Sequence, residues 1–411
     1  MKARSKMTGA TRRGPFVAVG LALGGLPFLV GLSGLVSSCA ATDDGDTDVP
    51  IAPAPLPEAG ATDGASEAGV DGGCDASDPA CVTKPISCDE AAWCPVATNV
   101  SSGYPLTAVW GSSKTDVWAA GSGGTVIHWD GAAWKATPPD PALTNTFRVV
   151  TGSGAGDVWV AAATDVIFRS DGFKNGTAAW TRVPSAAPPE GAAAPIYAGI
   201  SGGGDPTFGG QPFLLESFSW GNRIAKKPGA GPIAWETAEG SATVNGMWAA
   251  SADDVWLVGD NSLESFGGLP WQRAWTAHGT RVGDELVWTP VESQANVVLR
   301  AVWGSAASDV WAVGDNGTVR HVGAGGAEWS VVGAPTRENL RGIWGSAAND
   351  VWAVGELGTI LHWDGATWKE SVAAFPVNRR RPHLYGVWGS GPKDVWIVGD
   401  GIALRFTGGA K

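Results

Sequence analysis

The strongest constraint on the fold of this chain is a tryptophan-rich unit that recurs from Trp93 onwards. One copy begins at Leu340 with Leu-Arg-Gly-Ile-Trp-Gly-Ser and continues from Asp350 with Asp-Val-Trp-Ala-Val-Gly. It ends at Trp368 with Thr-Ile-Leu-His-Trp-Asp-Gly-Ala-Thr-Trp. All 23 tryptophans lie at or after Trp93. Such self-similarity is the signature of a repeat architecture, in which each copy is one supersecondary unit.

Each copy predicts four short strands separated by turns. The strand segments are rich in Val, Ile and Trp, and the segments between them contain the Ser, Asp, Asn and Gly residues that reverse a chain. The 60 glycines also disfavour a helical fold. A repeat of about 40–45 residues with four strands and a tryptophan signature is typical of a propeller blade. We therefore predict an all-β fold, a β-propeller of four-stranded blades.

Two markers count the blades. The first strand of a copy starts at seven positions, namely Leu106, Phe147, Ile196, Val244, Leu299, Leu340 and Leu384. A closing tryptophan marks the fourth strand of six copies, namely Trp134, Trp180, Trp235, Trp288, Trp329 and Trp368. The last copy has none, but Trp93 precedes Trp134 by 41 residues, as Trp288 precedes Trp329. We therefore predict seven blades, with an N-terminal strand around Trp93 completing the C-terminal blade and removing two free sheet edges.

Two neighbouring copies depart from the common pattern. The third copy starts at Ile196 and closes at Trp235, but it lacks Asp-Val-Trp and contains glycine-rich stretches that suggest long loops. The fourth copy carries a long third hairpin over residues 262–288. Insertions that cluster on neighbouring blades often build a binding surface.

Residues 1–38 predict a lipoprotein signal peptide. Five basic residues precede an uncharged apolar run over residues 15–36, and Leu35-Val36-Ser37-Ser38-Cys39 resembles a bacterial lipobox, in which the cysteine is lipidated. The alternatives are a plain secretory signal and an uncleaved anchor, because about twenty apolar residues can span a bilayer. Pro27 and the glycines of the run favour the signal, and Ala40 favours the outer membrane. We expect an exported lipoprotein that faces the periplasm or the outside.

Between the signal and the propeller we predict a disordered tether and a cysteine-rich collar. Residues 39–73 are rich in Ala, Pro, Gly and Asp and cannot bury enough apolar surface to offset their ordering entropy. The collar covers residues 74–94 and the propeller residues 91–411. In an exported chain Cys74, Cys81, Cys88 and Cys94 favour two disulfides, with three pairings open. A four-thiolate zinc site is the alternative, but the short Cys-x2-Cys spacing of such sites is missing.

The charge of the chain belongs mostly to its N-terminal segments. Residues 1–38 carry +5 and residues 40–92 carry −11, so that residues 93–411 carry −6 of the net −12. A propeller with this charge is not a strongly basic nucleic-acid binder. We predict no nucleic-acid partner, and contact with a membrane through the lipid anchor only.

Repeated polar positions within the blades favour structural roles. Six aspartates precede Val-Trp in equivalent turns, namely Asp116, Asp157, Asp254, Asp309, Asp350 and Asp394. Six equivalent sites indicate turn-capping carboxylates rather than six catalytic groups. His128, His321 and His362 share one third-strand position in different blades, with Arg169 and Arg405 at the equivalent position elsewhere. We expect these histidines to lie far apart, and we predict no metal and no cofactor. Arg379-Arg380-Arg381 is expected to be a solvated run.

One set of equivalent positions is variable but mostly polar. The residue after each first-strand start is Thr107, Arg148, Tyr197, Asn245, Arg300, Arg341 or Tyr385. If the first strands line the channel, these seven residues form a ring at its mouth. Arg and Tyr side chains in a ring suit carboxylates, phosphates or sugars, so we predict a ligand-binding ring. The alternative is a water-filled channel with a polar lining.

The repeat resembles known propellers. The endings Asp364-Gly-Ala-Thr-Trp368 and Asp130-Gly-Ala-Ala-Trp134 resemble the Asp-box, or BNR, turn of sialidase-like propellers, although they lack one residue between Asp and Gly. The whole unit resembles propellers in secreted lipoproteins of myxobacteria-like Gram-negative bacteria. More distantly, it is similar to the propellers of photosystem II stability and assembly factors. The resemblance concerns the fold, since such folds host many activities.

We expect a non-catalytic, monomeric envelope protein that binds a protein or a surface glycan. A sialidase-like enzyme is an alternative, but it requires a tyrosine nucleophile with a carboxylate partner and an arginine triad. The chain has only Tyr104, Tyr197 and Tyr385, and no Arg-Ile-Pro motif accompanies the first copy. A second alternative, which the resemblance implies, is an assembly factor for an envelope complex.

Overall fold

The computed structural model describes residues 74–75, 77–162, 166–183, 196–199, 214–218, 221–225, 235–238, 243–251, 253–261, 274–283, 285–323 and 328–408. The chain divides into two units, Met1–Ala68 and Gly69–Lys411, and every described residue belongs to the second unit. The predicted signal peptide, Cys39 and the tether therefore lie outside the described residues. Over the described part of the chain, no helix is long and apolar enough to cross a membrane.

The described residues form seven four-stranded antiparallel sheets, consistent with the seven predicted blades. Blades 1 to 3 contain β2 (Leu106–Ser113), β3 (Asp116–Gly121), β4 (Val126–Trp129) and β5 (Trp134–Ala136); β6 (Phe147–Gly154), β7 (Asp157–Ala162), β8 (Val166–Lys174) and β9 (Thr177–Arg182); and β10 (Ile196–Gly199), β11 (Leu214–Phe218), β12 (Gly221–Ala225) and β13 (Trp235–Ala238).

Blades 4 to 6 follow in the same order. They contain β14 (Thr243–Ser251), β15 (Asp254–Asp260), β16 (Ala274–Val282) and β17 (Glu285–Pro290); β18 (Leu299–Ala306), β19 (Asp309–Gly314), β20 (Val319–Val322) and β21 (Ser330–Val332); and β22 (Leu340–Ala347), β23 (Asp350–Gly355), β24 (Ile360–Trp363) and β25 (Trp368–Glu370). Two 3-10 helices, η3 (Asp315–Gly317) and η4 (Glu356–Gly358), form the turns between the second and third strands of blades 5 and 6.

Blade 7 confirms the predicted closure of the fold. It contains β26 (Leu384–Gly391), β27 (Asp394–Gly399), β28 (Ile402–Phe406) and, as its outermost strand, β1 (Trp93–Pro95). β1 pairs antiparallel with β28, so that Trp93 stands opposite Phe406. Trp93 is fully buried, and its indole N–H donates to Ser371 Oγ over 3.1 Å. The predicted role of the strand around Trp93 is therefore correct.

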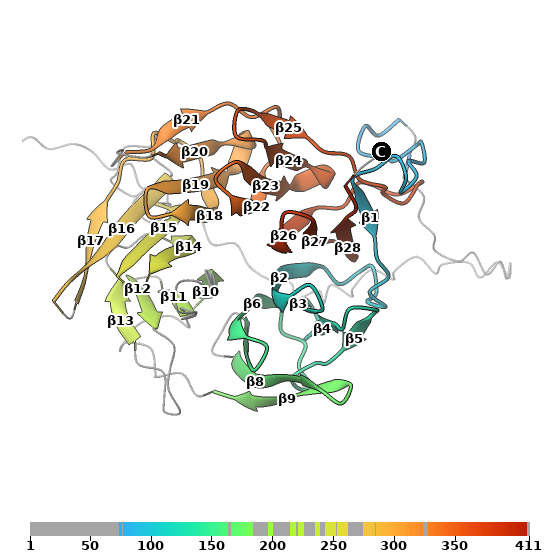
Figure 1. Cartoon of the computed structure of the whole chain (residues 1–411), viewed down its shortest axis with the longest axis horizontal. Coiled ribbons are helices and arrows are strands. Elements are labelled where there is room, and N and C mark those ends of the chain that lie inside the picture. The colour runs from blue at the N-terminus through green and yellow to red at the C-terminus, as the bar shows by residue number, and fades with distance from the viewer. Residues whose placement is uncertain are drawn as a thin grey trace, which may run out of the picture. The chain divides into compact units, whose positions relative to one another are not determined.

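The blades are arranged in a ring around the innermost strands (Figure 1). Each first strand contacts the first strand of the next blade, from β2 through β6, β10, β14, β18 and β22 to β26, and β26 contacts β2 again. The architecture is therefore a closed β-propeller, as the repeat predicts.

Tryptophans seal neighbouring blades in a recurrent edge-to-face arrangement. The second-strand tryptophan of one blade meets the closing tryptophan of the next with ring centroids 4.9–5.7 Å apart. The described pairs are Trp118–Trp180, Trp256–Trp329, Trp311–Trp368, Trp352–Trp93 and Trp396–Trp134. Aromatic pairs favour this geometry, and each large ring buries much apolar surface. The second-strand tryptophan and the closing tryptophan of the repeat are thus the two halves of one interface.

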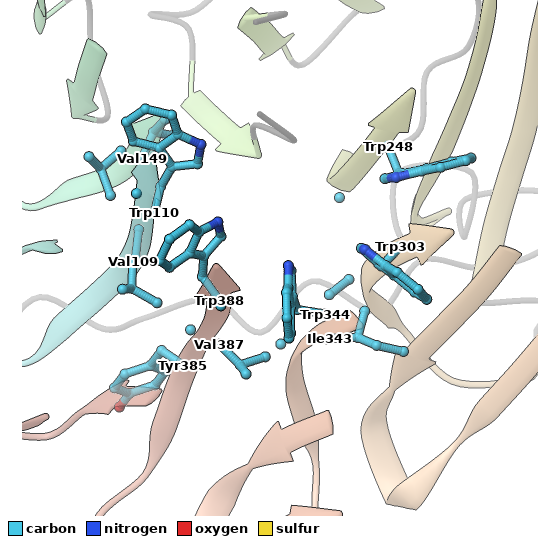
Figure 2. Close-up of a pocket in the computed structure, with 18 of the residues that line it drawn as sticks. Val109, Trp110, Val149, Trp248, Trp303, Ile343, Trp344, Tyr385, Val387 and Trp388 are labelled. Atoms are coloured by element: carbon cyan, nitrogen blue, oxygen red, sulfur yellow. The ribbon is translucent and has the colours of Figure 1, made fainter. Parts of the chain in front are cut away.

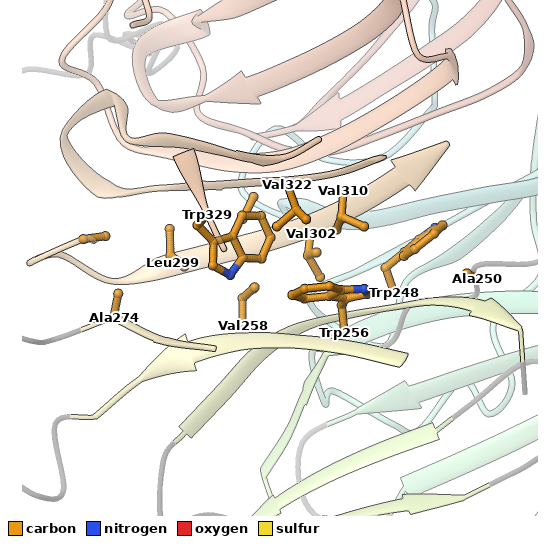
Figure 3. Close-up of a cluster of buried hydrophobic side chains, with 12 residues drawn as sticks. Trp248, Ala250, Trp256, Val258, Ala274, Leu299, Val302, Val310, Val322 and Trp329 are labelled. Atoms are coloured by element: carbon orange, nitrogen blue, oxygen red, sulfur yellow. The ribbon is translucent and has the colours of Figure 1, made fainter. Parts of the chain in front are cut away.

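Figure 3 shows one of these interfaces, between blades 4 and 5. Trp248, Trp256 and Val258 of blade 4 form a buried cluster with side chains of blade 5 that include Leu299 and Trp329. Five of the six buried clusters among the described residues combine side chains of neighbouring blades, so that these blades bury their apolar faces against each other.

The predicted collar is attached to the loop that precedes β26. Disulfides join Cys74 to Cys81 and Cys88 to Cys94. The collar backbone binds the backbone of the arginine run: Val82 N donates to Arg379 O over 2.9 Å, and Arg381 N donates to Ala80 O over 2.8 Å. The arginine side chains are exposed, as expected for a solvated run, and Arg380 pairs with Asp78 at 3.0 Å.

Candidate functional site

The candidate site is the central channel, a cavity of about 1060 Å³ lined by the first strands of blades 1, 2, 4, 5, 6 and 7. Each first strand leaves the register of the second strand at two points, for example between Leu299 and Ala301 and between Gly304 and Ala306. A bulge redirects the extra side chain. The variable polar position, Arg300 in this blade, falls at the first bulge, which explains why it lines the channel mouth.

The structure brings six of the seven predicted ring residues to this cavity. They are Thr107, Arg148, Asn245, Arg300, Arg341 and Tyr385. Tyr197 belongs to β10, but its side chain lies outside the described residues. Six of the seven equivalent positions therefore line one cavity. Whether these residues bind a ligand stays a prediction.

Three ring residues hold an acidic side chain from the turn that follows the second strand of their own blade. Arg300 donates from Nε and Nη2 to the two carboxylate oxygens of Asp315, each over 2.8 Å. Arg341 donates from Nε and Nη2 to a single oxygen of Glu356, Oε1, and Tyr385 Oη donates to Asp400 over 2.9 Å. A simple anion-binding ring requires free cations. Arg300 and Arg341 do not meet this requirement, because each is already paired with a carboxylate.

These contacts shift the acidities of the groups involved. The hydrogen bond to Asp315 raises the pKa of Arg300 despite its partial burial. Burial raises the pKa of Glu356, but hydrogen bonds from Arg341 and Asn339 outweigh it and the net shift is downward. Burial, with the hydrogen bond to Asp400, raises the pKa of Tyr385 to about 12. Tyr385 is thus a weaker acid than free tyrosine, the opposite of an activated nucleophile.

Two ring residues instead connect neighbouring blades. Thr107 Oγ1 donates to the carbonyl oxygen of Phe147 over 2.5 Å, and Asn245 Nδ2 donates to that of Leu299 over 3.0 Å. Arg148 differs from both groups. Its side chain is exposed, and it forms no ion pair with a described residue. Arg148 is therefore the ring arginine best placed to meet a partner.

Five tryptophans surround the channel nearer its other mouth: Trp110, Trp248, Trp303, Trp344 and Trp388 (Figure 2). We call this set the indole crown. Each indole lies over a glycine of the next blade. This glycine is the residue at which the second bulge begins. A Cβ atom built on Gly152, Gly304, Gly345, Gly389 or Gly111 would stand 2.5–2.7 Å from the six-membered ring of the respective indole. Each of these five contacts between an indole and a glycine thus interlocks two neighbouring blades.

The repeated aspartates bind side chains of their own blade. Asp116 accepts hydrogen bonds from Ser112 Oγ at 2.5 Å and from Trp118 Nε1 at 3.1 Å, and His128 Nε2 lies 2.7 Å from its Oδ1. We predicted turn-capping carboxylates at these positions. The carboxylates that accept backbone N–H groups in a turn are instead Asp130 and Asp364 of the Asp-Gly endings. That prediction was wrong about the partners, because the aspartate side chain points along its sheet towards the third strand.

This set of Ser, Asp and His is not a hydrolase triad. A general base must stand next to the nucleophile. In blade 1 the carboxylate of Asp116 separates the two, since it binds Ser112 through Oδ2 and His128 through Oδ1. The serine therefore donates to a carboxylate, which is a weak base, and the histidine does not reach the serine.

The histidines occupy separate blades, as expected. His128, His321 and His362 each lie within 2.7 Å of the aspartate of their own blade. A fourth third-strand histidine, His278, was not predicted from the sequence, and it lies 3.1 Å from Asp254. An insertion in blade 4 puts 24 residues between these two, whereas His128 follows Asp116 by 12. Over the described residues, no group of three His, Cys, Asp or Glu side chains could hold a metal ion.

Comparison with solved structures supports the fold. YCF48 from Cyanidioschyzon merolae has a TM-score of 0.54 and 17% identity over 77% of this chain and 98% of its own. YCF48 bound to D1 peptide has a TM-score of 0.55 and 15% identity over 79% and 97%. The WD40 β-propeller domain of Doa1 has a TM-score of 0.55 and 11% identity over 77% and 95%. No protein-family model and no curated protein matches the chain.

Proposed function

We propose that this protein is a non-catalytic, protein-binding β-propeller, held at the cell envelope by lipidation of Cys39. The observation that carries the binding role is the channel, whose lining includes the exposed Arg148 together with Arg300 and Arg341, each of which is held in an ion pair. The similar fold of YCF48, which has a structure bound to D1 peptide, supports a protein partner. Propellers commonly present such a mouth to partners.

The mouth favours a partner with accessible acceptor groups near Arg148. An arginine offers five N–H donors in a fixed fork and suits carboxylates best. Arg300–Asp315 and Arg341–Glu356 present both signs of charge. We therefore expect a mixed polar protein surface with an acidic side chain opposite Arg148. An assembly role in an envelope complex is one form of this function.

The test is site-specific photo-cross-linking of the full chain in its native cells. A photoreactive residue replaces Arg148 in one strain and Val331 in another. Val331 lies on the outer strand β21 and is 62% exposed, so it is an accessible control away from the channel. We expect a protein adduct from position 148 and not from position 331. Adducts with glycan alone, or none from position 148, would overturn the protein-binding role.

The identified partner then allows a binding measurement. Arg148→Ala should weaken binding about 10-fold, the loss of one charge-assisted hydrogen bond. Lys393→Ala removes an exposed positive charge from the turn between β26 and β27 and should leave affinity unchanged. Equal losses in both variants would mean that general charge, rather than the mouth, governs binding. For the anchor, Cys39→Ser should release the protein from the membrane fraction, and its retention there would contradict lipidation.

A further inference from the structure

The indole crown offers hydrogen-bond donors that the fold itself does not use. Figure 2 shows the indole nitrogens of Trp110, Trp248, Trp303, Trp344 and Trp388 turned towards the central opening. None of these five N–H groups bonds to a described residue, and none is among the buried indole nitrogens. Among the other described indoles, some donate within the fold, as Trp118 does to Asp116, and others are buried without a partner, as Trp311 is. The crown is therefore a set of converging donors that reach the cavity.

The edges of these indoles that carry the N–H groups are turned towards the opening. One face of each ring is covered by the glycine of the next blade, as at Trp303 on Gly345 and Trp344 on Gly389. Stacking of a sugar ring and attraction of a cation both require an open aromatic face, and the glycine removes one of the two faces from such contacts. The edge carries partial positive charge and an N–H donor, so the crown selects oxygen acceptors.

Charge at this mouth disfavours an anionic acceptor. Ser112, Ser305 and Ser346 line the same cavity two residues beyond the crown, and each is bonded to the aspartate of its blade. Burial raises the pKa of Asp116 and Asp350, but hydrogen bonds from the histidine and serine of each blade outweigh it, and the net shift favours the ionised form. An incoming phosphate or carboxylate would approach the carboxylates of Asp116, Asp309 and Asp350, whereas arginines pair with the equivalent aspartates of blades 2 and 7. An uncharged acceptor, such as a peptide carbonyl oxygen, meets the same N–H groups without that repulsion.

We propose that the indole crown binds an extended peptide segment of a partner protein, uncharged or basic, through its main-chain carbonyl oxygens. This inference rests on the proposed protein-binding function and assigns it a second contact within the channel. The cavity of about 1060 Å³ is within the range of peptide- and ligand-sized sites. Because the five indole N–H donors are neutral and equivalent, the crown should recognise main-chain oxygens rather than one particular side chain.

The test uses the full chain and an array of capped decapeptides in uncharged, lysine-containing and aspartate-containing sets, with soluble glycans beside them. The variant is Trp303→Phe with Trp344→Phe, which keeps the apolar interlock and removes two N–H donors. Trp311→Phe is the matched control: Trp311 stands opposite Trp303 in blade 5, and its indole nitrogen is buried. Because two net hydrogen bonds are lost, the double variant should bind peptides about 10-fold more weakly.

Direct observation of the donors provides a second readout that does not depend on the variants. In ¹⁵N-labelled wild-type protein, a capped uncharged peptide should shift the indole N–H resonances of crown tryptophans and leave that of Trp311 unmoved. Unchanged crown resonances, equal binding by the double variant, or preference for aspartate-containing peptides or glycans would each overturn the proposal. If the double variant binds the cross-linked partner with unchanged affinity, the crown proposal fails while the protein-binding function stands.

Discussion

A single carboxylate fixes three side chains in the first blade. Asp116 joins Ser112 at the end of β2, Trp118 in β3 and His128 in β4, and so connects three strands of one sheet. Burial raises the pKa of Asp116, but the hydrogen bonds from His128 and Ser112 outweigh it, and the net shift is downward. The folded state therefore favours the ionised carboxylate, which makes the stability of the blade depend on pH.

The downward shift of the pKa of Asp116 determines whether stability rises or falls with pH. A carboxyl whose pKa is lower in the folded than in the unfolded state stabilises the fold above its unfolded pKa of about 4. That contribution is lost as the pH falls through the lower folded value. Asp116→Asn should thus cost about 2 kcal/mol of unfolding free energy at pH 7, and less at pH 3. Urea unfolding at both pH values measures this.

Asp89→Asn is the control for this experiment. Asp89 is an exposed carboxylate of the collar, outside these networks. Its removal should change the unfolding free energy little at either pH. If the cost of Asp116→Asn were the same at pH 7 and pH 3, the ionised form would not be what the network stabilises.

The first strands that line the channel each have two bulges, and the two bulges have different roles. In β22 the first bulge directs Arg341 to the channel mouth, where Glu356 holds it. The second begins at Gly345, which receives the indole of Trp303 from blade 5. The Leu-Arg and Trp-Gly pairs of the repeat are therefore not interchangeable strand residues. One pair belongs to the channel mouth and the other to the interface between blades.

Gly345→Ala should destabilise the protein. Its Cβ would stand 2.5 Å from an atom of the Trp303 ring and 2.8 Å from the backbone oxygen of Asp350, so that a packed ring and a backbone must both move. Overpacking of this kind costs about 1–3 kcal/mol. Gly333→Ala is the control, because its Cβ would meet no atom within 4 Å. Thermal unfolding measures the difference, and equal midpoints would show that the interlock is loose.

The elements were predictable where their signals are local and periodic. The strands, the turns and the pairing of Trp93 with the last blade follow from tryptophans at regular spacing. The partners of the ring were not predictable, because Asp315, Glu356 and Asp400 read as ordinary turn residues. They meet Arg300, Arg341 and Tyr385 only after the second strand has folded back 15 residues later. His278 was missed because an insertion changes its distance from Asp254 along the chain.

The whole propeller depends on a three-residue strand. β1 is contributed by the N-terminal side of the chain, whereas its partner β28 lies at the C-terminal side. Trp93 packs edge-to-face on Trp352 of blade 6 at 4.9 Å, so that it joins blade 7 both to itself and to its neighbour. The collar reinforces this closure, since the disulfide between Cys88 and Cys94 reaches β1 itself. Loss of the contacts of Trp93 should therefore destabilise the structure first on both sides of blade 7.

Trp93→Phe tests this view of the ring. The smaller ring loses the hydrogen bond to Ser371 and part of the contact with Trp352, yet still fills most of the site. In repeat folds each unit contacts its neighbours, so that local opening spreads from the weakened interface. Amide hydrogen exchange of the variant should therefore accelerate in β1, β28 and β22–β25 and stay unchanged in β14–β17 of blade 4. Trp180→Phe in blade 2 is the control for losing a closing tryptophan elsewhere, and it should leave exchange in β28 unchanged. Uniform acceleration in all described blades would mean that the propeller opens as one unit, and that closure at β1 has no special weight.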